Sequence, residues 1–258
     1  MIPYLVIPLF SFLASALTLV SGFGLNTILL PVFTLFFPVP AAVALTAVVH
    51  LLNNLTKLAF FGKHADRNRV LLFGLPALGA AFLGAKVFIG FSHFDPVLHY
   101  SLLGREIAVL PVKIVIAGAM IFFALEDFIF REKKRSGGEL HWILGGLLSG
   151  FFGGLSGHQG AFRSSFLVKS GLPKESFIGT GVVIACLVDL ARLFVYRSLF
   201  NPAQLRENSA LILLAFVPAF LGIFLGSYWV KKVTFQRVRQ IVTGMLLFIA
   251  LGLAAGLI

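Results

Sequence analysis

Ten apolar stretches, separated by short polar segments, fill almost the whole chain of 258 residues. They cover residues 2–20, 24–37, 40–61, 70–91, 107–130, 140–155, 160–170, 176–197, 207–230 and 238–257. Only 12% of the residues are charged, which is about half the share that a soluble domain carries. This pattern predicts an all-α integral membrane protein, and it excludes ordinary soluble enzymes, nucleic-acid modules and disordered tails.

Three of these stretches, 24–37, 140–155 and 160–170, are too short for an ordinary span. The hydrocarbon core is about 30 Å thick, so a helix needs about 20 residues to cross it. The short stretches therefore predict half-helices or re-entrant hairpins, and the ten stretches together are expected to form six long spans and two pairs of short helices. The first stretch lacks the positive segment that opens a secretory signal, so we expect it to belong to the mature fold.

An internal repeat relates the two halves of the chain. The pairs that recur at an offset of 135 residues are Ser21 with Ser156, Gly22 with Gly157, Pro38 with Pro173, Asn54 with Asp189 and Lys57 with Arg192. We expect residues 1–130 to form a first transmembrane repeat, 131–139 a cytoplasmic linker and 140–258 a second repeat, together one structural unit.

The charges of the short loops predict how the repeats are oriented. Lys and Arg exceed Asp and Glu by 11, and the loops 62–69, 131–139 and 231–239 hold three or four basic residues each, which predicts that they are cytoplasmic. The loops 92–106 and 197–206 hold one and two, and neither terminus holds any, so both termini are predicted outside. Equivalent loops then lie on opposite sides, which predicts inverted repeats, and inverted repeats with short broken segments are typical of secondary transporters.

Glycine-rich sequences open short segments at matching positions in the two halves, as Ser21-Gly22-Phe23-Gly24-Leu25-Asn26-Thr27 and Gly153-Gly154-Leu155-Ser156-Gly157-His158-Gln159-Gly160. Glycine lets the backbone break at depth, and the helix that follows begins with unpaired amides and a positive dipole end. Two such ends facing each other predict an anion site. Its candidate substrate-binding residues are Gly24, Asn26, Thr27, Gly157, His158 and Gln159. Close helix packing through glycine is the alternative interpretation.

Arg163 follows the second break by one turn. A charge at the bilayer centre costs about 2.5–3.5 kcal/mol even on the lenient insertion scale, so this guanidinium needs a partner. A sulfonate, sulfite or carboxylate group can accept two parallel hydrogen bonds from it, with Ser164 and Ser165 as further donors. Alternatively, Arg163 pairs with carbonyls or an acidic side chain and only holds the hairpin.

Two long stretches carry polar side chains at helical spacing. Such side chains normally face the bundle interior or a water-filled path. The second-tier pathway candidates are His50, Asn54, Lys57, Asp189 and Arg192. Lys57 lies close to the predicted cytoplasmic end and can instead snorkel, and Asp189 and Arg192 can simply neutralise each other.

Metal and enzyme chemistry find little support in the sequence. No second ligand stands at metal-binding spacing from His158, so neither a metal nor a cofactor is expected. Zinc-protease, nucleophile-elbow and phosphate-loop motifs do not occur, which argues against an enzyme. The single cysteine, Cys186, excludes an intramolecular disulfide framework.

These glycine motifs resemble those of the sulfite exporter TauE/SafE family of membrane permeases. The resemblance rests on Ser21-Gly22-Phe23-Gly24 followed by Pro31, and on Ser149-Gly150-Phe151-Phe152-Gly153-Gly154-Leu155-Ser156-Gly157. It implies export of small sulfur-containing anions, such as sulfite or sulfoacetate, across a prokaryotic inner membrane. The family's more common run of three glycines is replaced here by Gly24-Leu25-Asn26 and Gly157-His158-Gln159-Gly160, so a different organic anion is an open alternative.

The sequence therefore predicts two inverted repeats whose broken or re-entrant short helices meet near the bilayer midplane and move a small anion outward. The expected partners are this anion and the lipid bilayer, without nucleic acid, and a homodimer is compatible with the sequence. Two other functions stay open. One is a non-transporting membrane scaffold or partner subunit, and the other is a carrier of a cation or neutral solute.

Overall fold

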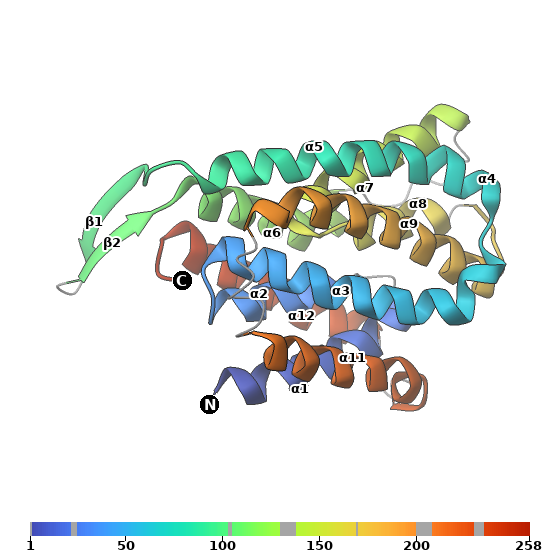
Figure 1. Cartoon of the computed structure of the whole chain (residues 1–258), viewed down its shortest axis with the longest axis horizontal. Coiled ribbons are helices and arrows are strands. Elements are labelled where there is room, and N and C mark those ends of the chain that lie inside the picture. The colour runs from blue at the N-terminus through green and yellow to red at the C-terminus, as the bar shows by residue number, and fades with distance from the viewer. Residues whose placement is uncertain are drawn as a thin grey trace.

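The computed structural model describes residues 2–21, 25–102, 105–129, 138–168, 170–199, 208–229 and 235–258, and these residues are almost entirely helical (Figure 1). The longer helices are α1 (Pro3–Ser21), α2 (Leu25–Thr34), α3 (Val39–Phe61), α5 (Leu75–Ser92), α6 (Pro111–Ile129), α7 (Glu139–Ser156), α8 (Gly160–Val168), α9 (Lys174–Tyr196), α11 (Ser209–Trp229) and α12 (Phe235–Ala254). Three short helical segments, η1 (Gly62–His64), α4 (Arg67–Arg69) and the π-helical η2 (Val70–Gly74), connect α3 to α5, and η3 (Arg197–Leu199) follows α9. The all-α membrane fold predicted from the hydropathy pattern is confirmed.

The helix boundaries follow the duplication in the sequence. Helices α2 and α8 begin 135 residues apart, and α3 and α9 both begin and end at that same offset. Pro38 and Pro173, one of the repeated pairs, directly precede α3 and α9, where a proline fits because the first helical residues need no internal acceptor for their N–H groups. At 10 and 9 residues, α2 and α8 are about 15 and 14 Å long, which is half of a membrane crossing.

The helices of the two halves pack on one another rather than as separate bodies. Helix α1 packs against α11 and α5 against α7, while α3 packs against α9 and α6 against α12. The larger hydrophobic core correspondingly draws on both halves, from Ile7 in α1 to Leu253 in α12. This arrangement buries the short helix α2 completely, whereas α8 is buried at Gly160, Phe162 and Leu167 and exposed at Val168.

A β-hairpin stands where the sequence predicted only a solvent loop. Strands β1 (Leu98–Leu102) and β2 (Arg105–Val109) pair antiparallel, and α6 begins at Pro111 rather than near residue 107. Proline cannot donate to a strand ladder but suits the first turn of a helix, so Pro111 marks the change from strand β2 to helix α6. The hairpin contacts the C-terminal end of the chain, because the Tyr100 hydroxyl donates a hydrogen bond to the Ala255 carbonyl oxygen.

The two ends of the molecule carry different parts of the chain. Figure 1 shows both termini on the side of the β-hairpin, at the left, whereas α4 lies at the right end. Helix α3 leads through η1 directly to α4, so it begins at the left end and runs to the right. The chain from α1 to the start of α3 therefore enters the bundle and returns to the end from which it started.

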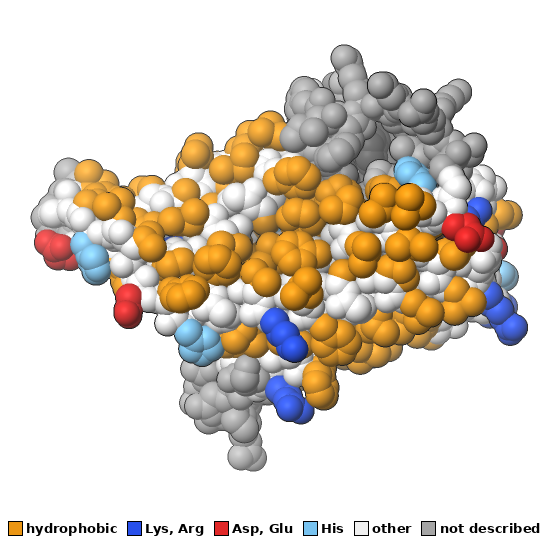
Figure 2. Space-filling model, turned by 90° about the horizontal axis from the view of Figure 1, so that it is seen from above, with side chains coloured by type: hydrophobic (Ala, Val, Ile, Leu, Met, Phe, Trp, Pro, Cys, Tyr) orange, Lys and Arg blue, Asp and Glu red, His pale blue; other side chains and the backbone are white. Residues whose placement is uncertain are grey.

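The outer surface is apolar. Leu5, Ile241 and Phe248 are each at least 70% exposed, and Figure 2 shows hydrophobic side chains over most of one face, with acidic side chains near its two ends. Among the described residues, three helical segments are long and apolar enough to cross a membrane: Val39–His64, Arg67–Ser92 and Lys174–Tyr196. Shorter apolar helices are Pro3–Leu17, Leu25–Thr34, Pro111–Leu125, Ser209–Leu225 and Gln240–Ala254. A contiguous apolar surface of this extent suits a lipid-embedded protein.

Helices α5 and α7 touch through backbone. Three glycines of α7, one turn apart, face three carbonyl oxygens of η2 and α5: Gly146 on Phe73, Gly150 on Ala77 and Gly154 on Ala81. A Cβ atom built on any of these glycines would lie only 2.0–2.2 Å from the facing oxygen. Only glycine therefore permits this distance between the helices, as small residues do in membrane bundles.

We expect Gly150→Ala to destabilise the protein by about 3 kcal/mol, at the upper end of overpacking costs, because α5 and α7 must separate. Gly79→Ala is the matched control, since Gly79 lies on α5 with nothing within 4 Å of its Cβ position. Thermal unfolding in detergent measures both variants. Equal unfolding temperatures for the two variants would contradict this role of the glycine contact.

Candidate functional site

The second glycine-rich break lies inside the helix bundle. Helix α7 ends at Ser156, and Gly157 takes a left-handed conformation with φ of 80° while its N–H donates to the Gly153 carbonyl oxygen at 2.9 Å. A residue with a side chain rarely adopts this conformation, so glycine ends the helix here. His158 and Gln159 continue outside helical geometry, and α8 begins at Gly160.

The start of α2 meets the second break. Asn26, in the first turn of α2, is fully buried, and its Nδ2 donates to the Ser156 carbonyl oxygen at 2.9 Å. This bond satisfies a carbonyl that the end of α7 leaves without a helical partner. Thr27 is buried beside Asn26, whereas Gly24 lies outside the described residues. The start of α2 and the end of α7 therefore meet in the interior.

The carboxylate of Asp189 is the centre of the polar interior. Its Oδ2 accepts hydrogen bonds from His50 Nδ1 at 2.7 Å and from Asn54 Nδ2 at 2.9 Å, both from α3. Its Oδ1 accepts one from Gln159 Nε2 at 3.0 Å and lies 2.8 Å from Arg192 Nη2. The carboxylate is fully buried, so these four contacts replace the water that it loses.

Two repeat-equivalent residues touch in this cluster. Asn54 and Asp189 stand 135 positions apart, and they are hydrogen-bonded directly. Equivalent residues can touch only where the two repeats cross, which here is the contact of α3 with α9. The second-tier candidates His50, Asn54, Asp189 and Arg192 therefore form one cluster. We call this cluster the Asp189 junction, and we include in it Asn26, Gly157, His158 and Gln159.

The guanidinium of Arg192 lies between this carboxylate and the second break. Its Nη1 would be 2.3 Å from a Cβ on Gly157, and Asn26 Nδ2 would be 2.1 Å from the same point. Arg192 is fully buried, and among the described residues its Nε and Nη1 have no hydrogen-bond partner. A buried guanidinium with open donors is costly unless another acceptor reaches it.

His158 presents an acceptor rather than a donor. The Ser156 hydroxyl donates to the Phe152 carbonyl oxygen at 3.2 Å, so in its 2.9 Å contact with His158 Nδ1 the ring nitrogen must donate. Nε2 of the neutral ring is then an acceptor, and within the described part of the chain it has no partner. The ring stacks on Phe123 of α6, with centroids 5.0 Å apart.

Arg163 reaches the junction through Gln159. Its Nη1 donates to Gln159 Oε1 at 2.9 Å, and its Nε lies 3.5 Å from the Cβ position of Gly181 in α9. Arg163 is half-buried, and it is Arg192, not Arg163, whose guanidinium stands beside Gly157. Lys57 is buried on α3 one turn from Asn54, and the ion pairs among the described residues, both made by Asp189, do not include it.

The predicted serine donors do not both face the junction. Ser165 is exposed, and its hydroxyl donates to the Phe162 carbonyl oxygen at 2.9 Å. Ser164 is half-buried on the same helix. Ser149 belongs to the second glycine-rich motif but was not among the predicted site residues. Its hydroxyl supports the break by donating to the Gln159 carbonyl oxygen at 3.0 Å.

Tyr196 is a second residue that was not among the predicted site residues. It is fully buried, and its hydroxyl donates to the Gly154 carbonyl oxygen, three residues before the second break. The only signal in the sequence was a phenol at the end of a long apolar stretch.

Among the described residues, no group of three or more His, Cys, Asp and Glu side chains could hold a metal ion.

Comparison with known proteins gives one match. A family model described as "Sulfite exporter TauE/SafE" matches residues 7–253, which is nearly the whole chain. No curated protein matches the chain, and no solved structure does. The matched region includes both breaks and every residue of the Asp189 junction.

Proposed function

Since this chain belongs to the sulfite exporter TauE/SafE family, a family of membrane transporters of sulfur-related anions, we propose that it exports a small sulfur-containing oxyanion through the Asp189 junction. Sulfite and small organosulfonates such as sulfoacetate are the cargoes that the proposal names, and the prokaryotic inner membrane is the proposed location. The protein acts in this proposal as a carrier and not as an enzyme.

An excess of positive charge at depth carries the proposal. Arg192 and Lys57 are buried and Arg163 is half-buried beside them, whereas Asp189 is the one carboxylate among the buried side chains that the structure describes. Buried charges are normally paired, so an excess of three cations over one carboxylate favours an additional anion. An oxyanion at the junction would supply the missing negative charge.

The open hydrogen-bonding groups suit an oxyanion that keeps one hydrogen. Arg192 Nε and Nη1 offer donors, and His158 Nε2 offers an acceptor. Hydrogen sulfite carries oxygens that accept hydrogen bonds, and it also carries a hydroxyl that donates one. The aromatic stacking of Phe123 on His158 would hold that acceptor in one orientation.

The helix arrangement supports an inverted pair of repeats. The packing of α1 on α11 has its repeat counterpart in the packing of α7 on α5, and α3 packs on its own counterpart α9. An alternating movement of one repeat against the other would open the junction to each side in turn. In the proposed orientation, the end with α4 faces the cytoplasm and both termini face outward.

A cation carrier has less support. Asp189 already contacts His50, Asn54, Gln159 and Arg192, so both of its oxygens are occupied. A membrane scaffold without transport would not require open guanidinium donors in the interior. It is nevertheless the outcome to accept if no anion moves.

We expect sulfite-dependent outward movement of negative charge, which is an inward current by convention, when the protein is reconstituted in proteoliposomes with an inside-negative potential. The potential contributes about 2.3 kcal/mol per elementary charge per 100 mV, so anion efflux needs no coupled ion. Sulfite, sulfoacetate, thiosulfate and acetate are compared, with empty liposomes as the control. Flux without current would reject uncoupled anion movement, and no flux with any of these anions would favour the scaffold.

A further inference from the structure

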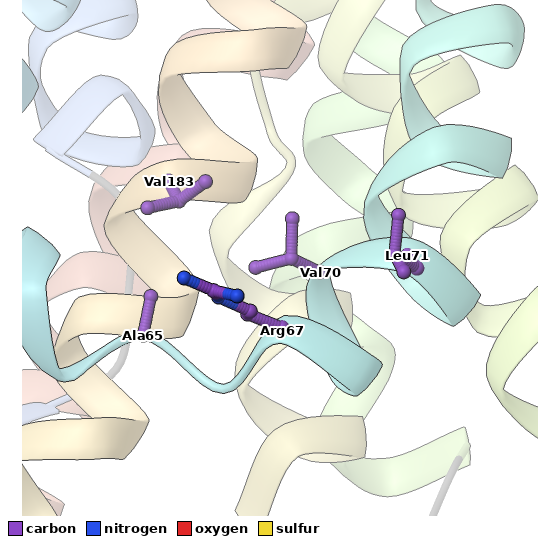
Figure 3. A pocket seen from close by; sticks show the side chains of 5 residues that line it. All are labelled: Ala65, Arg67, Val70, Leu71 and Val183. Atoms are coloured by element: carbon purple, nitrogen blue, oxygen red, sulfur yellow. The ribbon is translucent and has the colours of Figure 1, made fainter.

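A pocket of about 270 Å³ lies between α4, η2 and α9, away from the Asp189 junction (Figure 3). Its lining residues are Ala65, Arg67, Val70, Leu71 and Val183. It lies at the end of the bundle that holds α4, at the right in Figure 1. Leu71 is 56% exposed, so the pocket opens onto the apolar outer surface rather than into the protein.

The lining combines a hydrocarbon wall with one positive charge. Four of the five lining residues are aliphatic, and Figure 3 shows the Arg67 side chain pointing toward Val183, between Ala65 and Val70. The nearest carboxylate in the sequence, Asp66, is engaged elsewhere, because its Oδ1 accepts from the Arg69 N–H at 2.8 Å. An amphiphile with an anionic group fits both parts of this surface.

Arg67 is available for such a group. The hydrogen bonds and ion pairs between described residues do not involve its guanidinium. Arg69, two residues along the chain, differs because its guanidinium lies over the Trp142 ring, 4.1 Å from the centroid. Of these two neighbouring arginines, only Arg69 is held by an aromatic ring, and Arg67 extends over the pocket.

The backbone explains why a pocket forms here. Residues 70–74 are π-helical, which widens the turn, and they stand beside α9. One turn further along, a Cβ on Gly74 would be only 3.2 Å from Ile184 Cγ1, so glycine lets the two elements close together there. The gap is therefore open at Val70 and Leu71 and closed at Gly74.

We propose that this pocket binds an anionic phospholipid. The phosphate lies on Arg67, and the part of an acyl chain next to the head group packs against Val70, Leu71 and Val183. Charge complementarity identifies the head group, because Arg67 is the one charged residue of the lining. The aliphatic wall requires an attached chain, which a free phosphate ion lacks. The exposed Lys63 nearby adds positive charge at this end, as is typical of sites for anionic lipids.

The test is native mass spectrometry of the purified protein in detergent, with phosphatidylglycerol and phosphatidylcholine of identical acyl chains. We expect wild type to retain phosphatidylglycerol in preference, and Arg67→Gln to lower that retention at least about tenfold, as loss of a charge-assisted hydrogen bond would. Arg197→Gln is the matched control, because Arg197 is also exposed and stacks on Phe194 at the far end of α9. It should retain the lipid like wild type.

A second variant tests the hydrocarbon wall. Leu71→Asn should lower retention of phosphatidylglycerol while Arg67 stays in place, and inorganic phosphate should not compete with the lipid. Equal retention by wild type and Arg67→Gln, or competition by inorganic phosphate, would overturn the proposal. Sulfite flux in the same variants should be present, so failure of the lipid site and failure of the transport proposal give different results.

Discussion

Replacing Arg192 with Gln should lower the affinity for sulfite at least about tenfold, because a charge-assisted hydrogen bond contributes about 1.5–3 kcal/mol. Arg192 is fully buried, its Nε and Nη1 have no hydrogen-bond partner in the described part of the chain, and Nη1 stands beside Gly157. Arg192→Lys should restore binding only in part, since it returns the charge without the planar fork. Isothermal titration of sulfite into the purified variants is the measurement.

Loss of folding must be separated from loss of binding in this variant. Arg192 pairs with Asp189 at 2.8 Å, and removal of one partner of a buried pair costs about 3–5 kcal/mol of stability. The double variant Asp189→Asn/Arg192→Gln removes both charges, so it should be more stable than Arg192→Gln and still fail to bind sulfite. Wild-type affinity in a folded Arg192→Gln protein would remove Arg192 from the site.

Arg163 is the comparison within the same site. Its Nη1 bond to Gln159 connects it to the Asp189 junction, so Arg163→Gln should also weaken binding and Arg163→Lys should restore part of it. A smaller loss than in Arg192→Gln is expected, because Arg163 is half-buried and stands behind Gln159. If Arg163→Gln alone abolished binding, the sequence-based emphasis on Arg163 would be the better assignment.

The second large effect is expected for Gly157→Ala, which should reduce transport at least about tenfold relative to Gly171→Ala, a barrier change of about 1.4 kcal/mol. Both glycines have a positive φ, 80° and 68°, so both variants bear the same kind of backbone strain of about 1–2 kcal/mol. Only Gly157 also faces side chains, because its Cβ would lie 2.1 Å from Asn26 Nδ2 and 2.3 Å from Arg192 Nη1.

The two variants are compared by their sulfite flux in proteoliposomes, normalised to the amount of folded protein. The difference between the two variants isolates the contact at the junction from the strain that they share. Equal flux in both would mean that Gly157 matters only for its backbone conformation and that the two breaks need not touch. That result would remove the steric argument for a site between them.

Local patterns were enough to predict much of the fold. Apolar stretches predicted the helices because burial in lipid depends on runs of side chains that are continuous along the chain. The repeated Pro38 and Pro173 stand directly before α3 and α9 because a proline's effect on helix formation acts within one turn. The β-hairpin was missed because the pairing of 98–102 with 105–109 has no apolar run to mark it.

The sequence by itself determined that this is a helical membrane protein, and it predicted two halves with glycine breaks at matching positions, because hydropathy, glycine and proline act locally. Only the tertiary structure decided which polar groups meet. It joined Asp189 to His50 and Asn54, more than 130 residues earlier in the chain, and it turned Arg192 rather than Arg163 toward Gly157. The pairing of buried charges depends on how α3, α8 and α9 pack, and the spacing along one helix does not contain that information.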